Sequence, residues 1–211
     1  MSIIDRAKNI LLSPTSEWEA IAKESATVSG LLTGYAIPLM ILPIVGQVVA
    51  VGLLGIGAGG LAPLGLPSIG VMAAGAMGAV GFVLGLVVLY AMIFIVNAVS
   101  PSFSGKSDMT QAAKLMVYAS TPAWVAGLMA PFLGMIGGLL SFAAIGYVVY
   151  LIYQGIRPVM EAPQEKVAGF TVVIVLIYIV LSFVITVFVG GLLIAALLGG
   201  GMMAAGAASG M

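Results

Sequence analysis

The chain has 211 residues, of which 62% are hydrophobic and only 7% are charged. Soluble globular domains carry about 25% charged residues, so this composition excludes a soluble domain and indicates a membrane protein. Seven Lys and Arg residues balance seven Asp and Glu residues, and the chain contains neither His nor Cys. We therefore expect no nucleic-acid partner, no thiol chemistry, and no bound metal or other cofactor.

Residues 1–30 carry half of the charges and predict two short amphipathic helices. Apolar residues recur at helical spacing over residues 2–12, which favours a first helix there. Pro14 follows a Ser residue and suits the first position of a second helix that ends near Ser25. We expect both helices to lie at the membrane interface, with Trp18 at the boundary between lipid and water. A loosely ordered cytosolic tail is the alternative for this segment.

Long uncharged apolar runs predict five membrane spans, because about 20 apolar residues cross a bilayer as a helix. The expected spans are residues 31–54, 71–99, 109–130, 132–156 and 167–198. The fold class is therefore an all-α polytopic membrane bundle, with one membrane domain over residues 31–198 after the interfacial helices.

The remaining segments are rich in glycine and predict loops or tails. Residues 55–70 also contain proline and are expected to form a loop that either stays outside the membrane or dips back into it. Residues 199–211 are of low complexity and predict a flexible external tail. The main alternative to five spans folds the long last segment as a hairpin, which would return the C-terminus to the side of the N-terminus.

The positive charges predict the orientation of the spans. In a five-span topology all seven Lys and Arg residues fall on the side of the N-terminus, and the opposite side has none. Positive residues in short loops stay cytoplasmic. We therefore expect a multi-pass protein of the cell inner (plasma) membrane, with a cytoplasmic N-terminus and an external or periplasmic C-terminus.

No Asp or Glu lies inside any predicted span. Buried acids usually mark proton relays and ion-coupled carriers, so this absence argues against a proton-driven carrier. An intramembrane protease would need either a His partner for a serine or two membrane-embedded acids, and the chain offers neither. We therefore predict a non-enzymatic protein without a catalytic residue.

Two sets of residues are candidates for binding. The first set lies on the predicted cytosolic side and would form a face for partners: Trp18, Lys106, Asp108, Arg157, Glu161 and Lys166. The second set is polar, lies in or near the spans and would line a cavity: Gln47, Tyr118, Thr121, Tyr147 and Gln154. Hydrogen bonds between helices explain the second set more simply, and both interpretations stay open.

Glycines spaced four residues apart suggest close contacts between helices. They occur as three pairs: Gly30 and Gly34, Gly81 and Gly85, and Gly134 and Gly138. Packing within the bundle is the first interpretation, and a face for a homo-oligomer is the second.

Three stretches together resemble the Yip-one domain family, the Ypt/Rab-GTPase-interacting membrane proteins, in its bacterial branch. They are NILLSPTSEWEAIAKE at residues 9–24, SFSGKSDMTQAAKLMVYASTPAWVAGL at residues 102–128, and YVVYLIYQGIRPVMEAPQEKVAGFTVV at residues 147–173. The resemblance implies five spans with a cytosolic N-terminus and a luminal or external C-terminus. Eukaryotic members are implicated in vesicle traffic through prenylated Rab GTPases. This chain lacks their long N-terminal region with its acidic Leu-Tyr-Gly-Pro motif, which argues against Rab binding.

These observations lead to two classes of function. The first is a non-enzymatic, membrane-organising scaffold or partner-binding protein, whose partners would be the lipid bilayer and cytosolic or membrane proteins. The second is a channel or transporter for ions or small solutes, or a lipid-handling, scramblase-like protein. A dry core favours the scaffold and a continuous wet cavity favours transport.

Overall fold

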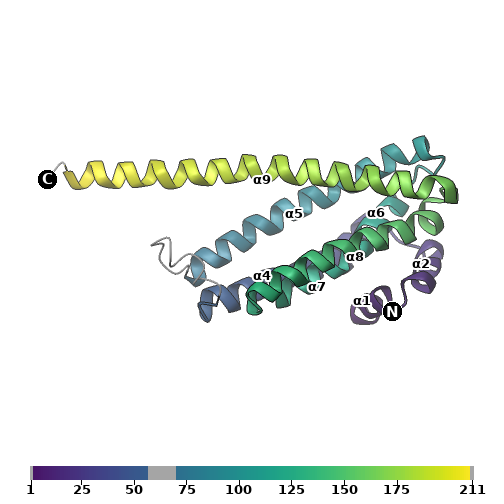
Figure 1. The fold of residues 1–211 in the computed structure, drawn as a ribbon, viewed down its shortest axis with the longest axis horizontal. Coiled ribbons are helices and arrows are strands. Elements are labelled where there is room, and N and C mark those ends of the chain that lie inside the picture. The colour runs from purple at the N-terminus through teal and green to yellow at the C-terminus, as the bar shows by residue number, and fades with distance from the viewer. Residues whose placement is uncertain (1, 57–69, 210–211) are drawn as a thin grey trace. The chain divides into compact units, whose positions relative to one another are not determined.

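The computed structural model describes residues 2–56 and 70–209, and the side chains up to residue 188 apart from 186. Within these residues the chain is helical and contains no strand (Figure 1). Five helical segments are long and apolar enough to cross a membrane: Val28–Leu53, Val71–Phe103, Met109–Phe132, Met135–Met160 and Gln164–Ile185. The predicted all-α bundle with five candidate spans is confirmed. Most of the predicted loop at 55–70 lies outside the described residues.

Two short helices precede the first span, as the periodicity predicts. They are α1 (Ile3–Leu12) and α2 (Pro14–Lys23). The Ser2 side chain caps α1 by accepting a hydrogen bond from the Asp5 backbone N–H at 3.1 Å. Pro14 opens α2, where its missing N–H costs no helical hydrogen bond.

The first span contains two wide helical turns. It consists of α3 (Val28–Leu31), the π-helical turn η1 (Leu32–Ala36), α4 (Ile37–Gln47) and a second π-helical segment, η2 (Val48–Leu53). At the end of η1 the Ile37 N–H bonds to the Leu32 carbonyl, five residues back. Pro38, which has no N–H to donate, follows at once, so the wide turn sits where the regular ladder is already interrupted. This turn carries Tyr35, which is buried.

A polar loop joins the second and third spans. The elements are α5 (Val71–Val99), the 3-10 turn η5 (Ser100–Phe103), α6 (Met109–Ala119), α7 (Thr121–Met129) and the 3-10 turn η6 (Ala130–Phe132). The Asp108 side chain caps α6 by accepting hydrogen bonds from the Thr110 and Gln111 N–H groups. The third span breaks at Ser120, and Pro122 lies in the first turn of α7, where its missing N–H is tolerated.

The fourth and fifth spans are α8 (Met135–Met160) and α9 (Gln164–Ser209). Gly134 precedes α8 with a φ of 54° and a ψ of −125°, a conformation open only to glycine. The expected fourth span ends at residue 156, but α8 continues through Pro158 to Met160, because a proline in the last turn removes only one helical bond.

The chain divides into two compact units, Met1–Ile174 and Val175–Met211, and the division lies within α9. Within the described residues α9 runs without a turn to Ser209, past the expected end at residue 198, so the hairpin alternative is not observed. The flexibility expected of residues 199–211 stays a prediction, and residues 210–211 lie outside the described residues. The side chains of α9 described in the second unit are mostly exposed and apolar, as a lipid-facing helix requires.

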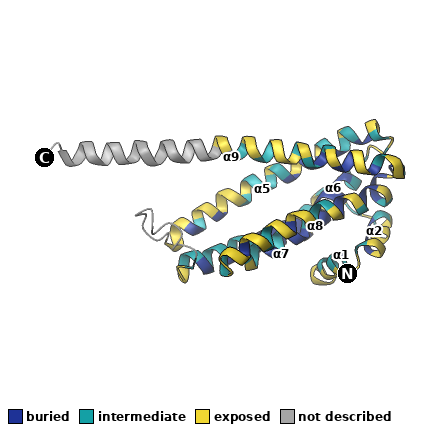
Figure 2. Cartoon of the chain, in the orientation of Figure 1, coloured by how far each residue is buried: buried dark blue, intermediate teal, exposed yellow. Residues whose placement is uncertain are grey.

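The helices of the first unit bury some of their apolar side chains against one another and expose many other large apolar ones. Figure 2 shows exposed residues along α5 and one side of α8, and buried residues along α6. Phe142 on α8 is 79% exposed and Val83 on α5 is 58% exposed. Such faces suit contact with lipid chains.

A close crossing joins α4 and α7. A Cβ atom added at Gly46 would lie 2.4 Å from the Leu128 carbonyl oxygen, and one added at Gly127 would lie 2.7 Å from Pro43 Cγ. The expected glycine pairs contribute less, because Gly34, Gly81 and Gly138 face open space. The close contacts between helices therefore occur at other glycines. The position of the neighbouring backbone, and not a four-residue spacing, decides where a glycine is needed.

This crossing gives a first prediction. The change Gly46→Ala should lower the free energy of unfolding by about 2 kcal/mol, because the added methyl group meets backbone atoms that cannot turn aside. Denaturant unfolding in detergent, followed by circular dichroism, measures the loss. Gly81→Ala is the matched control and should leave stability unchanged or slightly raised. Equal stability of both variants would contradict the observed crossing.

Candidate functional site

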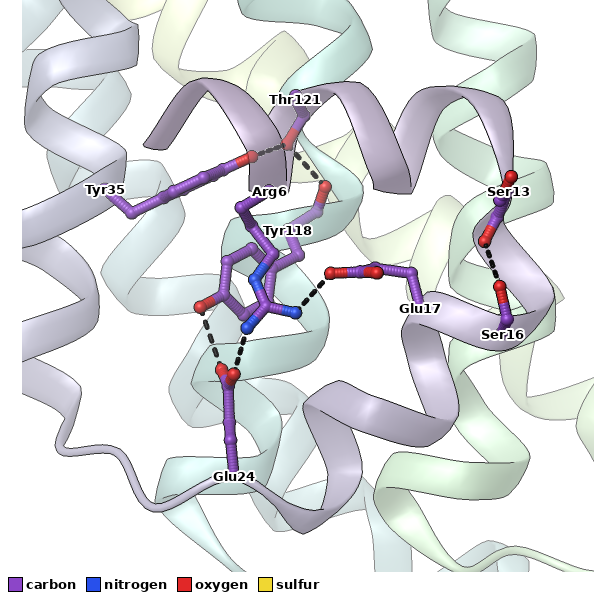
Figure 3. A network of polar contacts seen from close by, with 8 residues as sticks. All are labelled: Arg6, Ser13, Ser16, Glu17, Glu24, Tyr35, Tyr118 and Thr121. Carbon is purple, nitrogen blue, oxygen red and sulfur yellow. Dashed lines mark hydrogen bonds and ion pairs between the residues drawn. The ribbon is translucent and has the colours of Figure 1, made fainter. Parts of the chain in front are cut away.

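A buried ionic network ties the N-terminal helices together. The Arg6 guanidinium on α1 donates from Nη1 to Glu17 Oε1 on α2 and from Nη2 to Glu24 Oε2 at the end of α2 (Figure 3). The three side chains are only 12%, 9% and 24% exposed, respectively. Charges this poorly solvated are tolerated because they are paired. The network therefore fixes α1 against α2.

The same network reaches the third span through Tyr118 on α6. The Tyr118 hydroxyl donates to Glu24 Oε1 at 2.9 Å, and the Arg6 guanidinium carbon lies 5.3 Å from the centre of the Tyr118 ring. A cation over an aromatic face at this distance is attracted to it. One tyrosine thus binds both charged partners, so the N-terminal helices are attached to the bundle.

A second tyrosine continues the cluster into the first span. The Tyr35 ring meets the Tyr118 ring edge to face, with centroids 4.8 Å apart. Thr121 Oγ1 donates to the Tyr118 carbonyl at 2.7 Å and lies 2.9 Å from the Tyr35 hydroxyl. Since the threonine proton is already used, Tyr35 is the donor to Thr121. Figure 3 shows these contacts, which connect α3–η1 to α6 and α7.

The end of α2 is held by a lysine in the third span. The Lys114 ammonium, only 2% exposed as a residue, donates to the Glu24 carbonyl at 2.7 Å and to the Ala22 carbonyl at 3.4 Å. Gln111 also donates to the Ala22 carbonyl, at 3.3 Å. A cation at the carboxyl end of a helix stabilises it, because the last carbonyl groups have no partner within the helix.

A pocket of about 610 Å³ lies beside this network. Its walls come from the start of α1, the connection between α2 and α3, the first turns of the first span and one residue of α6. The lining residues are Ser2, Ile3, Arg6, Glu24, Ser25, Ala26, Thr27, Gly30, Leu31, Gly34, Tyr35 and Tyr118. The pocket therefore combines a cation, an anion, hydroxyl groups and apolar surface.

Of the five residues expected to line a cavity, Tyr118 lines this pocket and the other four do not. Thr121 is buried beside it, and Gln47 is half-buried in α4. The Tyr147 hydroxyl donates to the Leu11 carbonyl at 2.8 Å, and Gln154 Oε1 accepts from the Thr15 hydroxyl at 2.9 Å. Tyr147 and Gln154 therefore hold α1 and α2 against α8, which agrees with hydrogen bonding between helices.

Trp18 is not part of an accessible face. Its side chain is fully buried, and a Cβ added at Gly155 on α8 would lie 2.8 Å from its indole ring. The expectation of a boundary or partner-binding tryptophan is thus corrected. The absence of a side chain at Gly155 leaves the space in which the indole packs, so Trp18 anchors α2 to α8.

The other five residues of the expected partner face lie in or next to two neighbouring loops, and we call them the loop cluster: Lys106, Asp108, Arg157, Glu161 and Lys166. Lys106 Nζ lies 3.6 Å from Glu161 Oε1, and the Lys106 N–H bonds to the Met160 carbonyl at 2.7 Å. Lys166 donates to the Ser104 hydroxyl at 2.7 Å. The structure therefore brings the two loops together, while Asp108 is occupied as the cap of α6.

Sequence reasoning missed Arg6, Glu17 and Glu24 as a cluster. One signal was present: Arg6 lies four residues before Ile10, and Glu17 lies four residues before Ile21, so each charge shares a face with a residue that is buried. Charges on a buried face indicate pairing. In the part of the chain that the structure describes, no three acidic side chains converge as metal ligands.

The geometry can now be set beside known proteins. Neither the curated proteins nor the solved structures contain a significant match to this chain. The family model of the Yip1 domain matches residues 8–186, which include α2, all five candidate spans and both loops of the loop cluster. The chain therefore belongs to the Yip1 domain family of multi-pass membrane proteins.

Proposed function

We propose that this protein is a non-enzymatic scaffold that organises its membrane through protein partners bound at a cytosolic face. The observation that carries the proposal is the gathering of charge at one end of the bundle. Figure 1 shows α1 and α2 at the same end as the connection between α8 and α9. The loop that holds Lys106 bonds to this connection through the Met160 carbonyl.

The interior of the spans supports a structural role over transport. Among the charged residues of the candidate spans, Lys114 lies furthest from a span end. Its ammonium group donates hydrogen bonds to backbone carbonyls at the end of α2. Carriers that couple to protons or ions usually place acids within their spans. The only acid in the five candidate spans is Glu165, in the first turn of the fifth. The charged chemistry is therefore directed outward at one end.

The loop cluster is the part of this end that suits a partner. Lys106 and Glu161 have side chains 51% and 63% exposed, so their ion pair contributes at most about 1 kcal/mol to folding and is free to exchange for a partner's charges. The Phe103 and Phe170 rings stack with their centroids 4.9 Å apart, and this contact ties η5, before the first loop, to α9, after the second. An exposed charged surface on a fixed base is suited to recognition.

The positive charges support a cytosolic orientation of this face. All seven Lys and Arg residues lie at this end or in the turn next to it, and such residues stay on the cytoplasmic side. The proposal therefore places the N-terminus and both loops in the cytoplasm of a cell inner membrane, and the C-terminus outside.

Charge reversal tests the proposal. The double change Lys106→Glu and Lys166→Glu should remove the proteins that co-purify with the wild type after mild extraction and crosslinking, because it reverses the sign of the loop cluster. Lys8→Glu makes the same kind of change at an exposed position of α1 and should retain the co-purifying proteins. Quantitative mass spectrometry of the crosslinked material is the measurement. An identical set of proteins from all three versions would overturn the partner face.

A further inference from the structure

We propose that the pocket beside Arg6 binds the headgroup of a zwitterionic phospholipid that carries a free amine, of which phosphatidylethanolamine is the common example. This site is separate from the loop cluster and does not depend on the proposed scaffold function. Its lining residues supply a guanidinium, a carboxylate, hydroxyl groups and an apolar wall within about 610 Å³. Ligand pockets typically span about 300–1,000 Å³.

The depth of the pocket matches the headgroup region of a bilayer. Residues 24–27 connect α2 to the first span, which begins at Val28. Tyr35, the lining residue furthest along the first span, lies seven residues after Val28, or about 10 Å at 1.5 Å per residue. Polar headgroup layers add about 5–8 Å on each side of the hydrocarbon core. The pocket thus extends from the headgroup layer to the upper part of the acyl chains.

The charges select a zwitterion. Arg6 has five N–H donors and directs one to Glu17 and one to Glu24, which leaves donors for a phosphate. Each Glu24 oxygen accepts one hydrogen bond, from Arg6 or from Tyr118, and keeps a lone pair for an ammonium group. A purely anionic headgroup would place a further negative charge beside the Glu24 carboxylate with no ammonium group to offset it, so the pocket discriminates against it.

Glycines make the space that the headgroup would occupy. Gly34 lies on the pocket wall, and a Cβ added to it would have no atom within 4 Å. Gly30 lies one turn earlier on the same wall. A larger side chain at Gly34 would therefore fill the pocket without displacing the helices around it.

The test is lipid retention by the purified full chain. Wild type, Gly34→Leu and Gly81→Leu are incubated in mixed micelles with equal amounts of phosphatidylethanolamine and phosphatidylglycerol of matched acyl chains, and bound lipid is counted by native mass spectrometry. Gly81 also faces open space but lies on α5, outside the pocket lining, so it is the matched control. The unfolding midpoint of each variant is measured in parallel and should be unchanged.

We expect the wild type and Gly81→Leu to retain phosphatidylethanolamine over phosphatidylglycerol by about tenfold, and Gly34→Leu to lose that excess. Equal retention of the two lipids by the wild type, or full retention by Gly34→Leu, would overturn the site. Free O-phosphoethanolamine should not displace the bound lipid, because it lacks the acyl chains that anchor a lipid in the bilayer. Complete displacement would show that the ligand is a soluble phosphoamine and would overturn the lipid source.

Discussion

The change Arg6→Met is expected to lower the free energy of unfolding by about 3 kcal/mol, the low end of the cost of breaking a buried ion pair. It leaves the Glu17 and Glu24 carboxylates without the cation that compensates them, at side-chain exposures of 9% and 24%. The loss should appear first as release of α1, because Arg6 is the residue that joins α1 to Glu24 and Tyr118. Denaturant unfolding in detergent and the rate of proteolysis near α1 measure both effects.

Removing the stranded charges provides the control for this change. The triple variant Arg6→Met, Glu17→Gln and Glu24→Gln should recover most of the lost stability, because neutral side chains are less costly to bury than unpaired carboxylates. If Arg6→Met alone is as stable as the wild type, or if the triple variant is less stable than the single one, the ionic network does not hold the N-terminal helices.

A still larger loss is expected for Trp18→Ala, about 4 kcal/mol, because a fully buried indole leaves a large cavity between α2 and α8. Gly155 has no side chain to fill that space, so the surrounding helices can close it only partly. The same unfolding assay measures the loss, and exposure of α2 to protease should accompany it.

Trp18→Phe separates packing from hydrogen bonding at this position. Among the described residues the Trp18 Nε1 group is buried without a hydrogen-bond partner, so its removal costs nothing beyond the smaller ring, about 1 kcal/mol. A tryptophan that served as a lipid-boundary anchor would instead tolerate Ala with little loss in detergent. That outcome would contradict the burial of Trp18.

The membrane architecture could be predicted from the sequence because it depends on local composition. Apolar runs free of acids identify five spans, and the residues at their ends, such as Asp108 before α6, follow capping preferences. Pro14 at the start of α2 is predictable for the same reason. These features need no knowledge of which helices are neighbours.

The site could not be predicted, because it depends on contacts between distant parts of the chain. Glu24 and Tyr118 are separated by 94 positions in sequence, and their pairing requires the docking of α2 near α6. The wide turn η1, which presents Tyr35 to Thr121, leaves no clear trace in composition beyond Pro38. Short amphipathic helices commonly lie at the boundary, which predicts a boundary position for Trp18, whereas the space beside Gly155 lets its indole pack against α8.

The two proposals make different use of the same end of the bundle. The loop cluster offers exposed charges to protein partners, while the pocket beside Arg6 offers paired charges and open space to a lipid. The ionic network lies between α1 and the pocket, so Arg6 both holds α1 in place and forms part of the pocket wall. Variants of Arg6 therefore report on stability, and Gly34→Leu is the change that reports on the pocket alone.

The central claim is that α1, α2 and both loops share one cytosolic face, and cysteine accessibility tests it most directly. The chain has no native Cys, so single cysteines introduced at Lys8, Ser107, Gln164 and Met135 can each be labelled without background. A membrane-impermeant maleimide should label the cysteine at position 135, an 89% exposed site at the opposite end, in intact cells. It should label the other three only after permeabilisation. Labelling of position 8, 107 or 164 in intact cells would contradict the account.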